Sequence, residues 1–556
     1  AKALGSSLSV LLLYTGLMWD YIRVFTVYGD DAEVAVNSCL PWFPLSRWGE
    51  WFTEGWSHYL TSYPDWGTIA ANTLKPVANL AFFVQGLLAE WAGEWAFLIG
   101  SYLAPVVTAF LAAYVFRKFT RMSDTACVLM GGIVATSAVW IGSLFGAVDI
   151  VNTFALMFSA LALALLPTGE LRPRPGTQIA ILVAMLLAIF SHESVLPLPF
   201  VCVALLFAYR PVRPEWRDLW PYAAALGLWV LVRVVVFQGS AEIYALDPSM
   251  YPLGKVIIYW AIAAFLPVDV RGTYLARGLA PTSGVISQAA ITVAIGVLVV
   301  LNLAALAVVT TDAVRHRDRR RLLLVGAFLM ATAPRVFTSP SWAASRFGGL
   351  PMLVGMILVL ELLTDRERTA RALVAVVLAA QLLYLGTGAV ELKRDYVTEA
   401  RAARAYAQYA AESIDAAQPD RVVVVNDRWG YYGVSEHERY VAGLPRTVDV
   451  VAINHFDGEG AIWTTGSAGG GTVTVERVGD DIVIEVSASG GSSLTFLGAV
   501  DVDFTVPNSG FHYELLEGTE PLPRAFRATG QIAGSRTIVI GYDPEAAGFL
   551  TPQVFE

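Results

Sequence analysis

The chain alternates between long apolar stretches and short polar connections. An apolar run of about 17 to 25 residues is long enough to cross a bilayer core as a helix. Runs of roughly this kind centre on residues 5–28, 95–116, 125–147, 149–167, 177–191, 194–209, 218–238, 284–310, 321–338, 346–364 and 371–390. The pattern predicts an α-helical polytopic membrane protein with about eleven transmembrane helices.

Composition supports this prediction. Of the 556 residues, 56% are hydrophobic and only 15% are charged, against about 25% charged in soluble proteins. The net charge of −9 gives no basic footprint for nucleic acid. The three cysteines suggest neither a disulfide framework nor a metal cluster. An ordinary soluble enzyme and a nucleic-acid-binding protein are therefore excluded.

The basic residues predict which side of the membrane each connection faces. They cluster in five alternate connections, at 117–121, 172–174, 210–217, 315–321 and 366–371. The positive-inside rule places these connections in the cytoplasm. The N-terminus is then inside, and the residues after Tyr28 and after about Val390 are outside. We expect a prokaryotic plasma membrane protein. The apolar segment 255–266 is predicted to lie at the outer interface, because counting it as a further crossing would place residues 315–321 outside the cell.

Two regions are expected outside the membrane. Residues 29–94 form a first extracytoplasmic loop within a membrane domain of residues 1–392, and its many Trp and Tyr suit amphipathic helices at the membrane surface. A small soluble subdomain with an aromatic core is the alternative. Residues 393–556 form a second domain, which opens with an Ala-rich helix to about Ala417 and continues with the strand 421–426. Alternating runs at 472–478, 481–486 and 537–540 predict an α/β segment and then a mostly β, sandwich-like domain.

Ionisable residues at the membrane edge are the candidates for chemistry, because a charge left in hydrocarbon costs several kcal/mol unless it is paired. Those on the predicted outer side are Asp30, Asp31, Asp149, His192, Glu193, Arg233, Arg335 and Arg346. Each has a plainer interpretation. Asp30 and Asp31 fit a solvated helix end, His192 fits a bond to a neighbouring carbonyl, and Arg233 fits a side chain that reaches lipid phosphate. Because all eight ionisable residues lie on the same predicted side of the membrane, we expect them to line a common cavity.

The order of these features resembles the GT-C glycosyltransferases. The acidic pair follows the first span, the phrase Leu74-Lys75-Pro76-Val77-Ala78-Asn79-Leu80 closes the outer loop, and Ser191 to Pro199 forms a Glu-containing apolar-Pro turn. Ser345-Arg346-Phe347-Gly348-Gly349 opens a late span. Within that superfamily, residues 1–390 look like bacterial protein O-mannosyltransferases and TMTC-type mannosyltransferases. Lys75 stands where Arg is more usual and Phe347 where Tyr is common, so a bidentate fork and a ring hydroxyl are absent.

The resemblance implies an inverting transferase that moves a sugar, such as mannose, from a polyprenyl-phosphate donor to a protein, glycan or lipid acceptor on the outer face. Asp30 is the expected catalytic base, assisted by Asp31. Lys75, Arg233 and Arg346 are expected at the lipid phosphate, and His192 and Glu193 at the sugar or phosphate. A cofactor is not required by the resemblance, and a divalent cation, Mg²⁺ or Mn²⁺, at Asp30 and Asp31 stays an open alternative.

Two functions from other classes compete with this hypothesis. A non-catalytic scaffold of a cell-surface assembly complex would keep the same fold without turnover. A transporter or lipid flippase would place charges at the bilayer midplane and carry inverted repeats. The charges here gather at one interface and no repeat is evident, which favours the transferase over the transporter.

Overall fold

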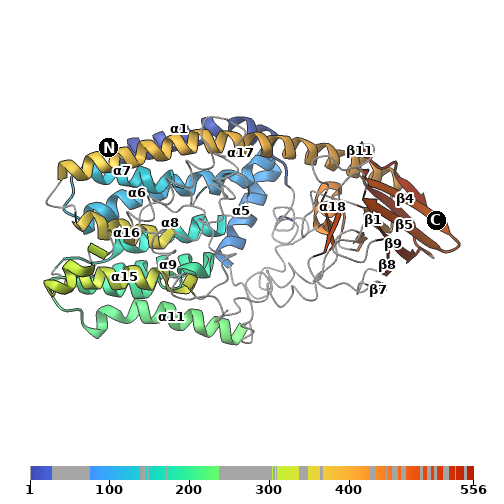
Figure 1. Cartoon of the computed structure of the whole chain (residues 1–556). Helices are drawn as coiled ribbons and strands as arrows, with labels where there is room; N and C mark the ends of the chain where they lie inside the picture. The colour runs from blue at the N-terminus through green and yellow to red at the C-terminus, as the bar shows by residue number, and fades with distance from the viewer. Residues whose placement is uncertain are drawn as a thin grey trace. The chain divides into compact units, whose positions relative to one another are not determined.

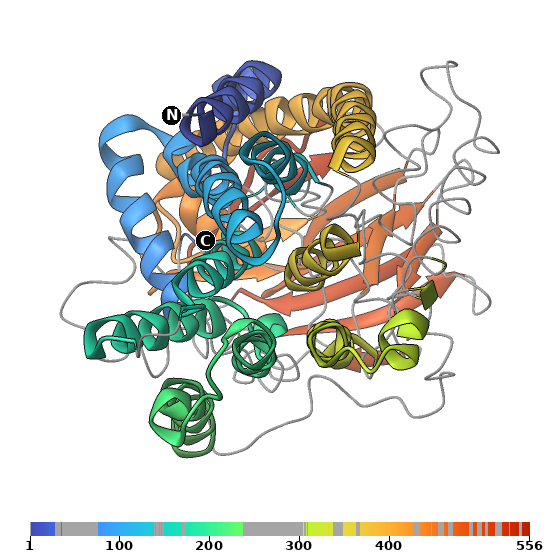
Figure 2. The same cartoon turned by 90° about the vertical axis from the view of Figure 1, so that its left-hand side faces the viewer.

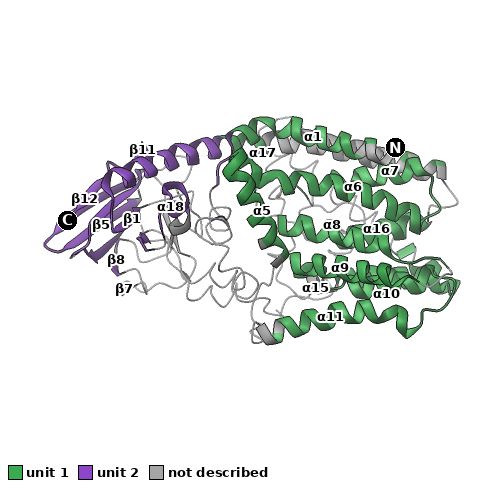
Figure 3. Ribbon diagram, turned by 180° about the vertical axis from the view of Figure 1, so that it is seen from behind, with its two compact units in different colours: residues 1–23, 72–397 green, residues 24–71, 398–556 purple. Residues whose placement is uncertain are grey.

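The computed structural model of the chain divides into two compact units, which are coloured separately in Figure 3. A mainly helical unit comprises residues 1–23 and 72–397, and a second unit comprises residues 24–71 and 398–556. The structure describes residues 2–27, 35, 76–137, 140, 144, 146, 150–169, 173–236, 304, 307–308, 310–336, 349–362, 367–425, 434–445, 447–453, 461–464, 471–488, 493–496, 503–505, 510–517, 525–532, 534–543 and 548–556.

Most described helices lie in the segments that the hydrophobic pattern predicts as spans, whereas the helix at residues 76–92 lies within the predicted outer loop 29–94 (Figure 1). They are α1 (Lys2–Val24), α5 (Pro76–Ala92), η3 (Glu94–Leu98), α6 (Ile99–Phe119), α7 (Asp124–Ala135), α8 (Ile150–Leu165), α9 (Pro175–Ser191), η6 (Glu193–Val195), α10 (Leu198–Tyr209), α11 (Trp216–Val236), α15 (Arg319–Val336), α16 (Gly349–Leu362) and α17 (Glu367–Ala417). The predicted span at 284–310 lies almost wholly outside the described residues. The prediction of a mainly helical chain with strands near its C-terminus is confirmed.

The described helices do not support the predicted count of about eleven crossings. Within the described residues, one helical stretch, Glu94–Phe119, has the length and apolarity that a membrane crossing requires. Both α7 and α10 have 12 residues, which is about 18 Å of helix against a bilayer core of about 30 Å. The hydrophobic pattern overestimated their length because α7 ends at the turn of Thr136 and Ser137, and α10 begins only after Pro197.

Close helix packing holds the helical unit together. Figure 2 views this unit nearly along its helices, which lie side by side, and α6 packs against both α7 and α8. A Cβ atom added to Gly131 would lie 2.4 Å from the Ala109 carbonyl oxygen, so this glycine lets α7 approach the backbone of α6. Apolar side chains such as Phe116, Leu156 and Phe328 fill the shared core.

Two sheets form the centre of the second unit. Strand β1 (Arg421–Val425) runs parallel to β2 (Asp449–Ala452) on one side and to β10 (Thr537–Asp543) on the other. The strands β11 (Gly548–Phe549) and β12 (Gln553–Phe555) pair antiparallel with β10. The second sheet is antiparallel, with the order β4-β5-β9-β8-β7. Its strands are β4 (Gly471–Val478), β5 (Asp481–Ala488), β7 (Asp503–Thr505), β8 (Phe511–Glu517) and β9 (Ala525–Gln531), and a separate pair joins β3 (Ala461–Thr464) to β6 (Ser493–Phe496).

Alternating side chains of β1 divide the core of this unit into two layers. Val423 and Val425 pack with Ile484 and Phe526 of the antiparallel sheet. Val422 and Val424 face the other way and pack with the last turns of α17. The helix α18 (Val434–Ala442) and the nearby Leu444 lie on the helical side of the sheet. The predicted α/β segment and β segment therefore interleave, because β10 from late in the chain pairs with β1.

Gly541 is required where β10 approaches β1. Its φ is +155°, and an added Cβ would lie 1.9 Å from the Val425 carbonyl oxygen. We expect Gly541→Ala to destabilise the mixed sheet by about 2–4 kcal/mol. Gly443→Ala is the matched control, because Gly443 also has positive φ but no atom lies within 4 Å of the added Cβ. Hydrogen exchange of the β1 amides in the full chain measures the difference, and equal exchange in the two variants would refute the steric explanation.

Candidate functional site

The structure describes only part of the predicted site. Asp30, Asp31, Lys75 and Arg346 lie outside the described residues, as do Asp149 and the interfacial segment 255–266. Arg233 lies in the last turn of α11, and the structure does not describe its side chain. The structure describes His192 and Glu193, which lie in the turn between α9 and α10.

The turn between α9 and α10 holds His192 in a fixed orientation. Helix α9 ends at Ser191, and His192 takes up an extended backbone with φ −161° and ψ 132°. The backbone N–H of Ser194 donates to His192 Nδ1 at 3.0 Å, so a neutral ring carries its proton on Nε2. The His192 side chain is 4% exposed. Glu193 then opens the single 3₁₀ turn η6, which continues into α10 after Pro197.

Helices α8 and α15 pack against this turn. Asn152 and Thr153 at the start of α8 are buried, as is Thr332 near the end of α15. The Thr332 hydroxyl donates to the Leu329 carbonyl oxygen at 2.9 Å. These polar side chains would cost free energy among apolar helices unless they form hydrogen bonds. The turn is therefore a buried polar region near one end of the helical unit.

A second buried polar position lies where α5, α6 and α8 meet. The Gln85 side chain is 4% exposed, and neither atom of its amide group has a hydrogen-bond partner among the described residues. An added Cβ at Gly100 would lie 2.8 Å from Gln85 Nε2 and 2.2 Å from Ile150 Cδ1, so the glycine makes room for the amide. An unpaired buried amide costs about 1–3 kcal/mol. The sequence pattern did not predict a role for Gln85, although it is the only amide in the apolar run Leu80–Leu88.

The basic connections lie at the other end of the helical unit, which we call the basic end. There Lys118 Nζ donates to the Ala164 carbonyl oxygen at 2.7 Å and joins the ends of α6 and α8. The Arg320 guanidinium lies 4.3 Å from the Tyr209 ring centroid and forms an ion pair with Glu361 at 2.9 Å. These contacts bring together the start of α15 and the ends of α10 and α16.

The length of α9 separates the two ends. Gln178 near the start of α9 donates to the Arg217 carbonyl oxygen at 2.9 Å, in the first turn of α11. The helix has 17 residues, which is about 25 Å at 1.5 Å per residue. The turn of His192 therefore lies far from the basic end.

A buried ion pair braces the basic end. Arg210 Nη1 lies 2.5 Å from Asp218 Oδ2, and the two side chains are 2% and 5% exposed. The backbone N–H of Glu215 also donates to Asp218 Oδ2, at 3.0 Å. The sequence pattern predicted Arg210 only as part of a basic cytoplasmic connection. The Asp eight residues later was available as a partner, but burial of the pair could not be inferred from the spacing.

The described residues contain no group of three or more His, Cys, Asp or Glu side chains arranged to hold a metal ion. A metal at Asp30 and Asp31 stays a prediction, because both residues lie outside the described part of the chain. The described turn offers an imidazole, a carboxylate and buried hydroxyl and amide groups. Such groups bind hydroxyl-rich ligands and exchange protons with them.

Comparison with known proteins assigns no family. No protein-family model matches the chain, and no curated protein sequence matches it closely enough to indicate common ancestry.

Proposed function

We propose that the chain is a membrane glycosyltransferase of the GT-C type, which transfers a sugar from a polyprenyl-phosphate donor to an acceptor on the extracytoplasmic face. The observation that carries the proposal is the separation of the buried turn at His192 and Glu193 from the basic end. A lipid-linked donor keeps its phosphate near a membrane surface, so its site belongs at one end of the helices. The basic end would face the cytoplasm, and the turn would face outward.

The chemistry of sugar transfer fits the residues proposed for this end. Transfer builds positive charge at the anomeric carbon and negative charge on the departing phosphate, while the acceptor hydroxyl loses a proton. Asp30 would accept that proton, assisted by Asp31. Lys75, Arg233 and Arg346 would stabilise the phosphate, and His192 and Glu193 would orient the sugar. Gln85 is a further candidate for a hydrogen bond to a ligand hydroxyl, because its amide has no partner among the described residues.

The membrane topology belongs to the same proposal. We propose a polytopic arrangement with an odd number of crossings, which places the N-terminus in the cytoplasm and residues 393–556 outside a prokaryotic plasma membrane. Tags placed in the connection 315–321 and at the C-terminus are then expected to report opposite sides of the membrane in accessibility assays on intact cells. Detection of both tags on one side would contradict this topology.

The transferase proposal is tested with the purified full chain in nanodiscs, polyprenyl-phosphate mannose and a hydroxyl acceptor. The reaction is expected to release polyprenyl phosphate as it forms the glycosylated acceptor. If the donor binds but is never consumed with any acceptor class, the scaffold function is favoured instead.

A further inference from the structure

The turn before α15 presents three arginines at the basic end. Residues 310–315 are helical, and Arg315, Arg317 and Arg319 follow at alternate positions with exposed side chains. None of the three forms an ion pair with any described residue. Their neighbours Arg320 and Arg321 are paired instead, Arg320 with Glu361 and Arg321 with Asp312 and Asp318. The turn and the first residues of α15 thus contain two paired arginines that fix their position and three whose charge faces outward.

Arg317 occupies a position that normally favours glycine. The Asp318 N–H donates to the Ala313 carbonyl oxygen at 2.9 Å, and the Arg317 N–H donates to the Val314 carbonyl oxygen at 3.2 Å. These two bonds define a Schellman motif, in which the residue at the position of Arg317 is left-handed and is usually Gly. Arg317 has φ +50°. Gln418 also has positive φ, but its side chain bonds to Asp415 locally, whereas the Arg317 side chain forms no such bond among the described residues.

The start of α15 is also unfavourable for arginine on grounds of helix stability. Arg319, Arg320 and Arg321 occupy its first turn, where the positive end of the helix dipole disfavours cations. Asp318 reduces this cost because its carboxylate accepts the Arg320 N–H at 3.0 Å. Both the left-handed backbone at Arg317 and the cations in the first turn are hard to explain by folding alone. An anion outside the protein would offset the cost of the clustered cations at this turn.

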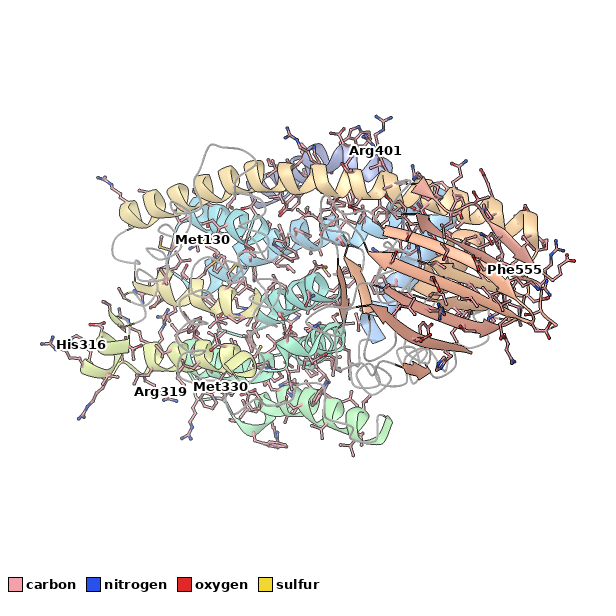
Figure 4. The ribbon with its side chains drawn as sticks, turned by 45° about the vertical axis from the view of Figure 1, so that its right-hand side comes forward. Met130, His316, Arg319, Met330, Arg401 and Phe555 are labelled. Carbon is pink, nitrogen blue, oxygen red and sulfur yellow. The ribbon has the colours of Figure 1, made fainter. Side chains whose placement is uncertain are left out.

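The apolar side chains around the turn favour a lipid headgroup as the anion. Val308 and Val314, just before the turn, are each 61% exposed, and Leu322 in the next helix is 39% exposed. Exposed apolar side chains beside outward cations are typical of a membrane interface. Figure 4 shows His316, which lies between Arg315 and Arg317 in the sequence, at the extremity of the helical unit. A soluble phosphate would not explain the apolar neighbours.

We propose that Arg315, Arg317 and Arg319 form a docking site for the headgroups of anionic phospholipids in the adjacent leaflet. Each arginine near a membrane surface contributes about fivefold to anionic-lipid preference, which is about 1 kcal/mol. The paired Arg320 and Arg321 hold the turn in place without contributing to the preference. The inference rests on the proposed membrane topology, but not on the proposed sugar transfer or on the residues assigned to it.

The test measures which lipids the full chain retains. The chain is reconstituted in nanodiscs of phosphatidylcholine with about 30 mol % phosphatidylglycerol, and co-purified lipid is counted by native mass spectrometry. We expect R315Q/R317Q/R319Q to lose phosphatidylglycerol preference by at least tenfold, since three contributions of about fivefold are removed. The control R401Q/R477Q/R536Q removes three exposed arginines of the second unit and is expected to keep the preference. Equal retention in the two triple variants would overturn the proposal, as would displacement of phosphatidylglycerol by millimolar inorganic phosphate.

Arg317→Gly separates lipid binding from folding. Glycine removes the cost of the left-handed backbone, so the thermal unfolding midpoint is expected to stay unchanged or rise. Phosphatidylglycerol preference is nevertheless expected to fall about fivefold. A variant with unchanged lipid preference would show that the Arg317 side chain has no part in docking.

Discussion

Asp30→Asn is expected to lower the rate of sugar transfer from a polyprenyl-phosphate donor by about 10²–10⁴-fold, the range that a positioned general base contributes. An amide keeps the size of the side chain but cannot accept the proton of the acceptor hydroxyl. Expression and thermal unfolding are expected to stay close to those of the wild type. The measurement is release of polyprenyl phosphate by the full chain in nanodiscs.

Asp20→Asn is the matched control for that substitution. Asp20 lies in α1, ten residues before Asp30, and its 67% exposed side chain forms an ion pair with Lys393 at 3.3 Å. An exposed pair contributes at most about 1 kcal/mol to stability, and nothing places Asp20 near the donor. Its loss should leave transfer unchanged. Full activity in Asp30→Asn, or equal loss in both variants, would contradict the assignment of Asp30 as the base.

Asp218→Asn is expected to destabilise the helical unit by about 3–5 kcal/mol, because it leaves the Arg210 charge buried without its carboxylate. Both side chains are almost fully buried, and no solvent compensates the loss. The measurement is the thermal unfolding midpoint of the purified chain. The double variant R210M/D218L removes both charges and is expected to recover much of the lost stability, because an apolar pair of similar volume avoids desolvation of two charges.

The Arg117 and Asp124 pair supplies the control for this prediction. Its geometry is similar, with 2.7 Å between Arg117 Nε and Asp124 Oδ1, but the two side chains are 57% and 71% exposed. Asp124→Asn is therefore expected to cost at most about 1 kcal/mol. A midpoint shift as large as that of Asp218→Asn would mean that burial does not determine the strength of these pairs.

Hydrophobic periodicity predicted the elements of the chain better than their lengths. The Ala-rich pattern placed the end of a helix at Ala417, where α17 ends, and the apolar run at 421–426 became β1. The pattern failed at α7 because the helix ends before Thr136 and Ser137, and at α10 because the apolar Val195 and Leu196 before it lie in turns. It also treated residues 371–390 and the Ala-rich stretch as separate helices, whereas α17 joins them without a break. Hydropathy does not show that a helix continues past the end of its apolar stretch.

Long-range pairing was the least predictable part. Nothing local in 537–543 shows that β10 lies beside β1, more than a hundred residues earlier. The burial of Gln85 likewise depends on the space left by Gly100 in another helix. In the candidate site, the sequence identified the turn at His192 and Glu193 but not the hydrogen bond from Ser194 that fixes the imidazole. Such contacts depend on how helices pack, and a single sequence does not encode them as a recognisable motif.

The proposed function requires a lipid-linked sugar donor to bind at the end of the helical unit that carries His192, away from the basic end. The most direct test is an experimental structure of the full chain in nanodiscs with polyprenyl phosphate. We expect phosphate density near the turn at His192 and Glu193, in contact with Arg346 and beside Asp30. Side chains that fill this region, or phosphate density of the polyprenol only at the basic end, would contradict it.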